Sequence, residues 1–115
     1  MIQEGQIVLF RFPQTDQAGA KLRPALILRK LPGPFDDWLI GMISTQISQQ
    51  IAGFDEIIDE NDTDFDQSGL KASSVIRISR LAVVNKNILL GSIGRINIER
   101  LNLVKNRLSA WIIGA

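Results

Sequence analysis

Residues 22–28 read L-R-P-A-L-I-L, a pattern typical of a buried β-strand. The last four of these residues form a continuous apolar run, which indicates a strand in the interior of a sheet. Proline is tolerated at the start of a strand, so Pro24 is compatible with a strand over residues 23–29. Arg23 opens this apolar strand, and we therefore expect its guanidinium group at the rim of a β-structure.

The segments on either side alternate between apolar runs and turn signals, with no internal repeat or linker. Runs rich in β-branched and aromatic residues predict strands, and the proline, glycine and polar stretches between them predict loops. Several short strands followed by a helix favour a mainly β domain, a small barrel or rolled sheet, with the C-terminal helix packed on it. The predicted strands cover residues 6–12, 23–29, 38–44, 54–58, 74–84 and 91–96, the loops cover residues 14–22, 30–37, 45–53 and 59–70, and one helical turn covers residues 85–90.

Residues 98–113 have the periodicity of an amphipathic helix. Asn97 is a favourable N-cap, and Glu99 lies in the first turn, where the helix dipole stabilises an anion. The apolar residues at helical spacing predict one face packed against the core. They are Leu101, Val104, Leu108, Trp111 and Ile112.

The composition excludes several kinds of chemistry. The chain has 115 residues, enough for one domain with its own core. It contains no cysteine, which excludes disulfides and thiolate chemistry, and no histidine, which removes the commonest general base and metal ligand. We therefore expect no metal site. The first residues do not resemble a signal peptide, and no apolar run is long enough to cross a membrane, so we expect a cytoplasmic protein.

Charge is distributed unevenly along the chain, although the net charge is only +1. Seven of the twelve acidic residues lie within residues 55–66, and outside this acidic segment thirteen Lys and Arg residues accompany five acidic ones. A basic body of this kind can bind a polyanion. The sequence leaves three interpretations of the acidic segment open: a solvated loop, a mobile flap that limits access to the basic face, or a site of partner contact.

Standard catalytic motifs are absent, so arginines and hydroxyl groups at strand ends are the remaining candidates for chemistry. Arg23 would bind a phosphate through two parallel hydrogen bonds, but it could equally form a surface ion pair. Ser44 and Thr45 follow the third strand, where their hydroxyls could donate to a phosphate oxygen or bond to their own backbone. Arg77 and Ser79 on a later strand complete the set.

Taken in order, several short stretches resemble the MazF/PemK family, the toxin components of bacterial toxin–antitoxin modules. The stretches span nearly the whole chain, and their ordered set is more specific than any one of them. The resemblance implies a single SH3-like barrel domain over residues 1–115, with a C-terminal helix and usually a homodimer. The matching stretches are G-Q-I-V-L at residues 5–9, F-P at 12–13, G-A-K-L-R-P-A-L-I-L at 19–28, M-I-S-T-Q at 42–46, G-L at 69–70, S-V-I-R at 74–77 and I-G-R-I at 93–96, with Leu81 and the final helix.

The resemblance also implies roles for individual residues. The main catalytic arginine of the family falls on Arg23, and its catalytic hydroxyl, usually a threonine, falls on Ser44, with Thr45 as the neighbouring alternative. Serine keeps the hydroxyl donor but lacks the methyl group that restricts the rotamer of threonine. We expect RNA-binding or auxiliary roles for Asp16, Lys21, Thr45, Gln46, Arg77 and Ser79.

Two departures from the family pattern leave the general base unassigned. Some relatives use an aspartate on the later strand, at the position where this chain has Ser79. Others use a histidine in the first loop, where Asp16 is the only acidic residue of this chain. Water, Asp16, and Arg23 acting as an acid alone are the alternatives.

The function that the resemblance implies is that of a toxin acting as a sequence-specific endoribonuclease. It would cut single-stranded RNA through the substrate's own 2′-hydroxyl, which DNA lacks, without a metal ion or other cofactor. We expect a cognate antitoxin to cover the groove around Arg23. Two alternatives use the same barrel without catalysis: a toxin that poisons DNA gyrase through a helix contact, for which Trp111 is the candidate, and a nucleic-acid-binding relative.

Overall fold

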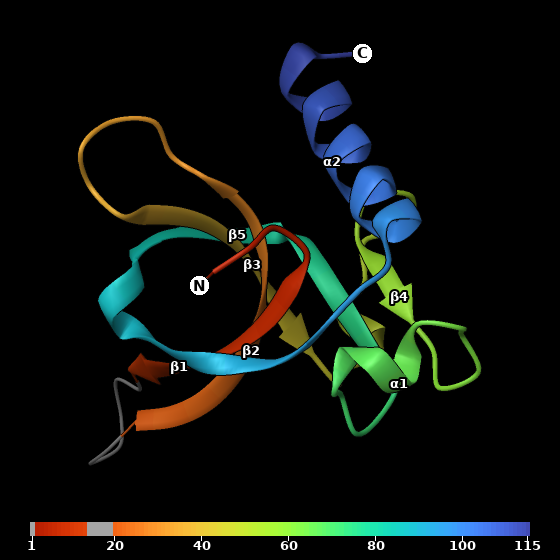
Figure 1. The fold of residues 1–115 in the computed structure, drawn as a ribbon. Helices are drawn as coiled ribbons and strands as arrows, with labels where there is room; N and C mark the ends of the chain where they lie inside the picture. The colour runs from red at the N-terminus through yellow and green to blue at the C-terminus, as the bar shows by residue number, and fades with distance from the viewer. Residues whose placement is uncertain (1, 14–19) are drawn as a thin grey trace.

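The computed structural model describes residues 2–13 and 20–115, which form one curved sheet with a long helix on one side (Figure 1). The sheet has six antiparallel strands in the order β4-β5-β3-β2-β1-β6. The predicted mainly β fold with a C-terminal helix is confirmed, and the barrel is open because β4 and β6 stand at opposite edges of the sheet. The elements are β1 (Gln6–Pro13), β2 (Ala20–Lys30), β3 (Asp37–Ser44), η1 (Ile47–Gln49), β4 (Glu56–Ile58), α1 (Phe65–Ser68), β5 (Ser74–Asn85), η2 (Lys86–Ile88), β6 (Leu89–Arg95) and α2 (Ile98–Ile113).

Alternate residues of the strands belong to two separate hydrophobic clusters, one on each face of the sheet. The larger cluster lies beneath α2 and joins that helix to Ile7, Leu26, Ile43 and Ile76. The smaller cluster lies on the opposite face, inside the curve of β1, β2 and β3, and includes Ala25. Both faces of β2 are therefore covered, which explains its continuous apolar run.

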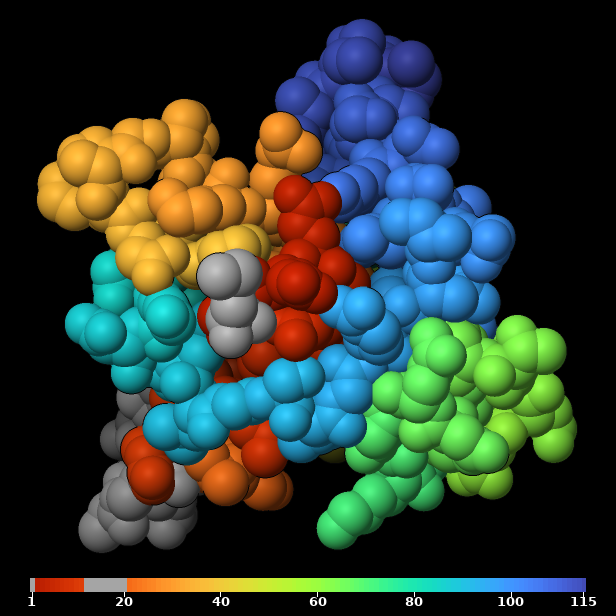
Figure 2. All heavy atoms as spheres, viewed as in Figure 1, coloured from red at the N-terminus to blue at the C-terminus, as the bar shows by residue number. Residues whose placement is uncertain are grey.

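The long helix begins and ends where the sequence predicts, but only part of its apolar stripe is buried. The side chain of Asn97 accepts a hydrogen bond from the backbone N–H of Arg100 at 2.8 Å, as expected of an N-cap. Leu101, Val104 and Leu108 are buried, whereas Trp111 is 65% exposed and Ile112 is 67% exposed. Core packing was the wrong prediction for these last two residues, because the end of α2 extends beyond the sheet (Figures 1 and 2).

Two local features differ from the sequence-based expectation. β2 begins at Ala20, so Lys21 and Leu22 belong to a strand and not to a loop, because they pair with Phe12 and Arg11 of β1. The single turn of α1 was not predicted, since four residues are too few to show helical periodicity. No helix in the described part of the chain is long and apolar enough to cross a membrane.

The acidic segment is neither a solvated loop nor a flap, because most of its carboxylates are bonded within the fold. The guanidinium group of Arg100 donates to Glu56 and Asp62 at 2.8 Å each and to Asp64 at 2.9 Å and 3.0 Å. Arg107 lies further along α2, and its Nη1 donates to Oε1 of Glu56 at 3.1 Å. Figure 2 shows the corresponding contact between residues 55–70 and the first half of α2. The segment therefore anchors α2.

These bonds predict that acid weakens the fold. Burial alone would raise the pKa of Asp64, but hydrogen bonds from Arg100 and from the backbone N–H of Asn97 lower that pKa below its ordinary value. The contribution of Asp64 to stability is therefore present above the unfolded-state pKa of about 3.9 and is lost as the pH falls through the folded-state pKa. In urea denaturation, we expect the free-energy difference between the wild type and Asp64→Asn to shrink from about pH 6 to about pH 3. A constant difference would contradict this assignment, and Asp66→Asn, at an exposed position, is the control.

Gly69 and Gly94 allow α1 to lie directly against β6. A Cβ atom at Gly94 would collide with the backbone of Gln67 and Ser68, and a Cβ atom at Gly69 would collide with the carbonyl group of Ile93. Gly69 also has a φ of +75°, which other residues rarely adopt. These contacts hold residues 69–72 in place, and those residues form one wall of the candidate site.

Candidate active site

Two cavities meet at Arg23 and Ser44, on the face of the sheet opposite α2. The register of β2 and β3 pairs Ala25 with Met42, and two residues further along it places Arg23 beside Ser44. Met42 pairs in turn with Arg77 of β5, which brings a second arginine to the same face. The smaller cavity, of about 260 Å³, is lined by Arg23, Met42, Ile43, Ser44, Gln49, Arg77 and Arg80.

The larger cavity lies on the other side of Arg23 and Ser44 and has a volume of about 600 Å³. Its walls come from β1, β2, β6, the end of β3 and the chain between α1 and β5. Arg23, Ile43 and Ser44 line both cavities, so the two form one groove that is divided at these residues. The polar and charged side chains lining the larger cavity are Lys21, Arg23, Ser44, Thr45, Gln46, Lys71 and Ser74.

Ser44 is held at the point where β3 ends. Its Oγ accepts a hydrogen bond from the backbone N–H of Gln46 at 3.0 Å, a short-range bond that turns the chain out of the strand. The Ser44 hydroxyl can therefore bond to its own backbone and donate to a phosphate oxygen at the same time. The bond uses Oγ as an acceptor, so the hydroxyl hydrogen can still be donated to a group in the groove.

Arg77 lines the smaller cavity and is held there by contacts with other side chains. Its side chain is only 14% exposed. Its Nη1 donates to Oε1 of Gln49 at 3.0 Å, and its Nε lies 3.8 Å from Oδ2 of Asp55, within ion-pair range. The guanidinium group is thus held by two residues of the chain between β3 and β4.

The groove is strongly basic. No Asp or Glu is found among the described residues that line either cavity. The cations on its walls are Lys21, Arg23, Lys71, Arg77 and Arg80. Positive charge confined to a concave surface attracts a polyanion, and arginine binds phosphate in a bidentate manner. The groove can therefore bind a chain of phosphates.

The structure brings together most of the residues predicted from the sequence. Arg23, Ser44 and Arg77 share the smaller cavity, whereas Lys21, Thr45 and Gln46 line the larger one. Ser79 lies outside both cavities, and its hydroxyl donates to Oδ2 of Asp55 at 3.0 Å. Asp16 lies outside the described residues.

Three residues of the groove were not foreseen. Gln49 belongs to a glutamine-rich stretch that gave no sign of a position near Arg77. Arg80 continues the run of basic and hydroxyl residues on β5, and Lys71 follows the G-L pair of the family resemblance. The sequence does offer a signal for Arg80 and Lys71, because each adjoins a residue that the family resemblance marks.

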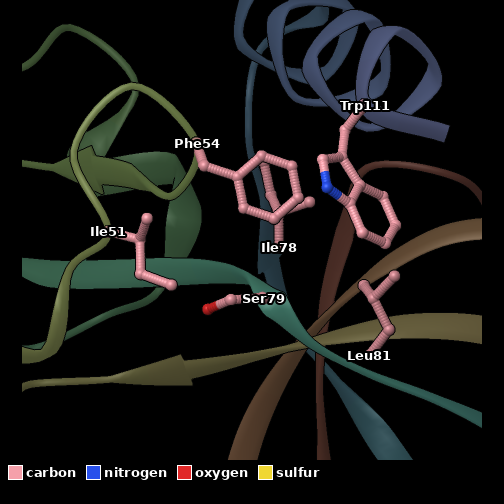
Figure 3. Close-up of a pocket in the computed structure, with 6 residues that line it drawn as sticks. All are labelled: Ile51, Phe54, Ile78, Ser79, Leu81 and Trp111. Carbon is pink, nitrogen blue, oxygen red and sulfur yellow. The ribbon is translucent and has the colours of Figure 1, made fainter. Parts of the chain in front are cut away.

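A separate apolar hollow of about 550 Å³ lies beside the end of α2 (Figure 3). The indole of Trp111 reaches toward Phe54, with ring centroids 5.8 Å apart, above the part of β5 that carries Ser79 and Leu81. Ile51 is half exposed at its rim. None of the described residues that line this hollow is charged, so its chemistry differs from that of the groove.

Residues that could hold a metal ion do not gather in the described part of the chain. No group of three or more Asp, Glu, His or Cys side chains lies close enough together there to bind one. Three acids of the acidic segment, Glu56, Asp62 and Asp64, bind Arg100, and Glu56 also binds Arg107.

Comparison with known proteins places the chain in a family. The family of PemK-like, MazF-like toxins of type II toxin–antitoxin systems matches residues 3–112. The chain belongs to this toxin family. A similar fold occurs in a solved structure described as an endoribonuclease in complex with its cognate antitoxin from a mycobacterial species. The TM-score is 0.63 at 16% sequence identity, and the match covers 99% of this chain and 96% of that one.

The likeness to that structure shows the fold alone at this level of identity. No curated protein matches the chain significantly. In this PemK/MazF-like toxin, the basic groove with Arg23 and Ser44 at its division is the candidate active site.

Proposed function

We propose that this toxin is an endoribonuclease that cuts single-stranded RNA at a phosphate bound between Arg23 and Ser44. The observation that carries the proposal is the groove, in which cations and hydrogen-bond donors from β2, β3, β5 and the segments between them converge and no described acid is present. A strand of RNA lying through both cavities would place one phosphate at their division. The bases on either side would then enter the two cavities.

In the proposed reaction the 2′-oxygen attacks the adjacent phosphorus, and the bond from phosphorus to the 5′-oxygen breaks. The products are a 2′,3′-cyclic phosphate and a free 5′-hydroxyl, and the leaving oxygen takes up a proton. Arg23 stabilises the negative charge that develops on the non-bridging oxygens, and Ser44 donates its hydroxyl hydrogen to one of them. The groove holds the 2′-oxygen in line with the leaving group.

The charge on the walls supports a mechanism without a metal ion. Arg23, Arg77 and Arg80 surround the smaller cavity, so side chains supply the positive charge near the phosphate. The general base is not among the described carboxylates, since none lines the groove. Water and Asp16 remain the candidates for removing the proton.

The proposal also covers the RNA sequence that is cut and the proteins that bind the toxin. Thr45 and Gln46 in the larger cavity carry the donors and acceptors that could read the edge of a base. We propose that a cognate antitoxin covers the groove, as a toxic nuclease must be inhibited in its own cell, and that the toxin is a cytoplasmic homodimer. The exposed apolar side chains of Trp111, Ile112 and Ile113 are of the kind that a protein interface covers.

The same apolar surface favours a second candidate function, a toxin that acts by binding a protein through the end of α2. Arg23 would matter little to such a toxin, whereas Trp111 would be essential. The basic groove has no role in that mechanism, which is why we place it second.

A cleavage assay separates the two functions. Purified toxin is incubated with a single-stranded RNA in excess chelator, and the ends of the fragments are mapped. The proposed nuclease yields cyclic phosphate and 5′-hydroxyl ends at a fixed short sequence. It leaves a DNA of the same sequence intact, because DNA has no 2′-hydroxyl. An RNA that remains whole under these conditions would contradict the proposal and favour the protein-binding toxin.

Ser44 provides a prediction at a single hydroxyl. We expect Ser44→Ala to lower kcat by about 100-fold, because it removes one donor aimed at the developing charge. Ser44→Thr keeps the hydroxyl and should retain most of the activity. Single-turnover cleavage of a short RNA gives both rates. Ser109→Ala is the control, since Ser109 is exposed on α2, and equal rates for Ser44→Ala and the wild type would contradict the role of Ser44.

A further inference from the structure

Asp55 is a carboxylate buried completely beside the smaller cavity. It is 0% exposed and does not line the groove. Its oxygens accept hydrogen bonds from the backbone N–H of Ile51 and from the backbone N–H and hydroxyl of Ser79, all at 3.0 Å. Burial of a carboxylate is strongly unfavourable unless such bonds compensate for the lost hydration, so an aspartate at this position needs an explanation.

The charge of Asp55 faces Arg77. Nε of Arg77 lies 3.8 Å from Oδ2 of Asp55, a distance too long for a hydrogen bond but within ion-pair range. The Gln49 side chain, six residues before Asp55 in the sequence, accepts from Nη1 of the same guanidinium group at 3.0 Å. One short segment of chain thus holds two nitrogen atoms of the Arg77 guanidinium, and the Arg77 side chain lines the smaller cavity.

The backbone at Asp55 is itself fixed. Nη1 of Arg107 donates to the carbonyl oxygen of Asp55 at 3.1 Å, and the same atom binds Glu56. Glu56 pairs with Ile76 in the sheet, one residue before Arg77. Asp55 therefore stands in a rigid frame built from α2 and β5, which is what a group that orients a neighbour requires.

We propose that Asp55 is a positioning residue for Arg77, an inference that rests on the proposed nuclease function. The Asp55 carboxylate also bonds to the hydroxyl of Ser79, two residues after Arg77 on β5, so it is tied to the strand that carries the guanidinium group. Asp55 does not act as the base, because it has no access to the groove. It holds the Arg77 guanidinium in the orientation that meets the phosphate.

The kinetic test is a double-mutant cycle. We expect Asp55→Asn to lower kcat by about 10- to 100-fold with little change in KM, because a misplaced group loses transition-state stabilisation. In an Arg77→Ala background, Asp55→Asn should have no further effect on kcat. Equal losses in both backgrounds would show a role independent of Arg77 and overturn the proposal. Asp66→Asn, the same chemical change at an exposed position of the acidic segment, should cleave RNA like the wild type.

A spectroscopic test does not depend on catalysis. The ¹H–¹⁵N signal of Arg77 Nε, assigned through its loss in Arg77→Ala, should shift in Asp55→Asn and stay in place in Asp66→Asn. An unchanged signal in Asp55→Asn would overturn the proposal. If Asp55→Asn does not fold, Ser79→Ala replaces it in both tests, because it removes one bond to the carboxylate without removing the charge. A wild type that cuts no RNA would contradict the nuclease function, and the Nε signal would still decide the role of Asp55.

Discussion

Replacing Arg23 with alanine is expected to lower RNA cleavage by about 10²- to 10³-fold while the protein stays folded, as is typical when one preorganised donor to a developing anion is removed. Among the residues that the structure describes, Arg23 is the one cation that lines both cavities, so its loss removes the positive charge from the place where they meet. Arg23→Lys keeps the charge but loses the bidentate geometry and should recover only part of the rate. The measurement is single-turnover cleavage, with circular dichroism as the check on folding.

Arg29 offers a matched control for this experiment. It lies on the same strand as Arg23, but its side chain is 74% exposed and pairs only loosely with Glu4 at 3.7 Å. Exposed ion pairs of this kind contribute little, so Arg29→Ala should cleave RNA at the wild-type rate. If Arg23→Ala and Arg29→Ala behave alike, Arg23 is not the catalytic arginine.

Replacing Arg100 with methionine is expected to destabilise the fold by about 3–5 kcal/mol, the usual cost of breaking a buried ion pair from one side. The side chain of Arg100 is 11% exposed and that of Asp64 is 2% exposed. Removing the cation leaves Asp64 and Asp62 without a counter-ion, whereas Glu56 keeps its ion pair with Arg107. Urea denaturation should show a lower midpoint with an unchanged m-value.

A double variant shows whether the loss comes from the stranded acids. Asp64→Asn combined with Arg100→Met removes one buried charge along with the cation, so it should be more stable than Arg100→Met alone. Arg95→Met is the control, because Arg95 is exposed and bonds only to the amide of Gln3 among the described contacts. A stability of Arg100→Met within about 1 kcal/mol of the wild type would contradict the anchoring role of this residue.

The elements that the sequence predicts well are those whose signals are local. The apolar runs around Ala25 and Ile40 locate β2 and β3, and Asn97 marks the start of α2 because a cap is a contact within one turn. The prediction that the end of the apolar stripe on α2 is buried is wrong, because periodicity shows which face of a helix is apolar and not how far the sheet extends beneath it. Trp111 has the spacing of a core residue and lies outside the core.

The residues of the candidate site likewise differ in whether a local pattern in the sequence marks them. Arg23 and Ser44 could be selected from the ordered family stretches, because each lies within a short recognisable run. The bond between Ser79 and Asp55 joins residues 24 positions apart, and that between Arg77 and Gln49 joins residues 28 positions apart. No local pattern encodes contacts over such separations, so the sequence could not show that the acidic segment is bonded to α2 and β5 and not a solvated loop, a mobile flap or a site of partner contact.

The ion pairs of α2 also have a consequence for biosynthesis. Arg100 follows Asp64 by 36 residues and Glu56 by 44, and Arg107 follows Asp55 by 52, so the acids leave the ribosome well before the cations that bind them. During that interval the carboxylates lack their cations, and the backbone at Asp55 lacks its hydrogen bond from Arg107. Chains fold from the N-terminal side as they are made, but this frame around Asp55 can be completed only after the helix has emerged. We therefore expect the groove to reach its final form late, after α2 has been synthesised.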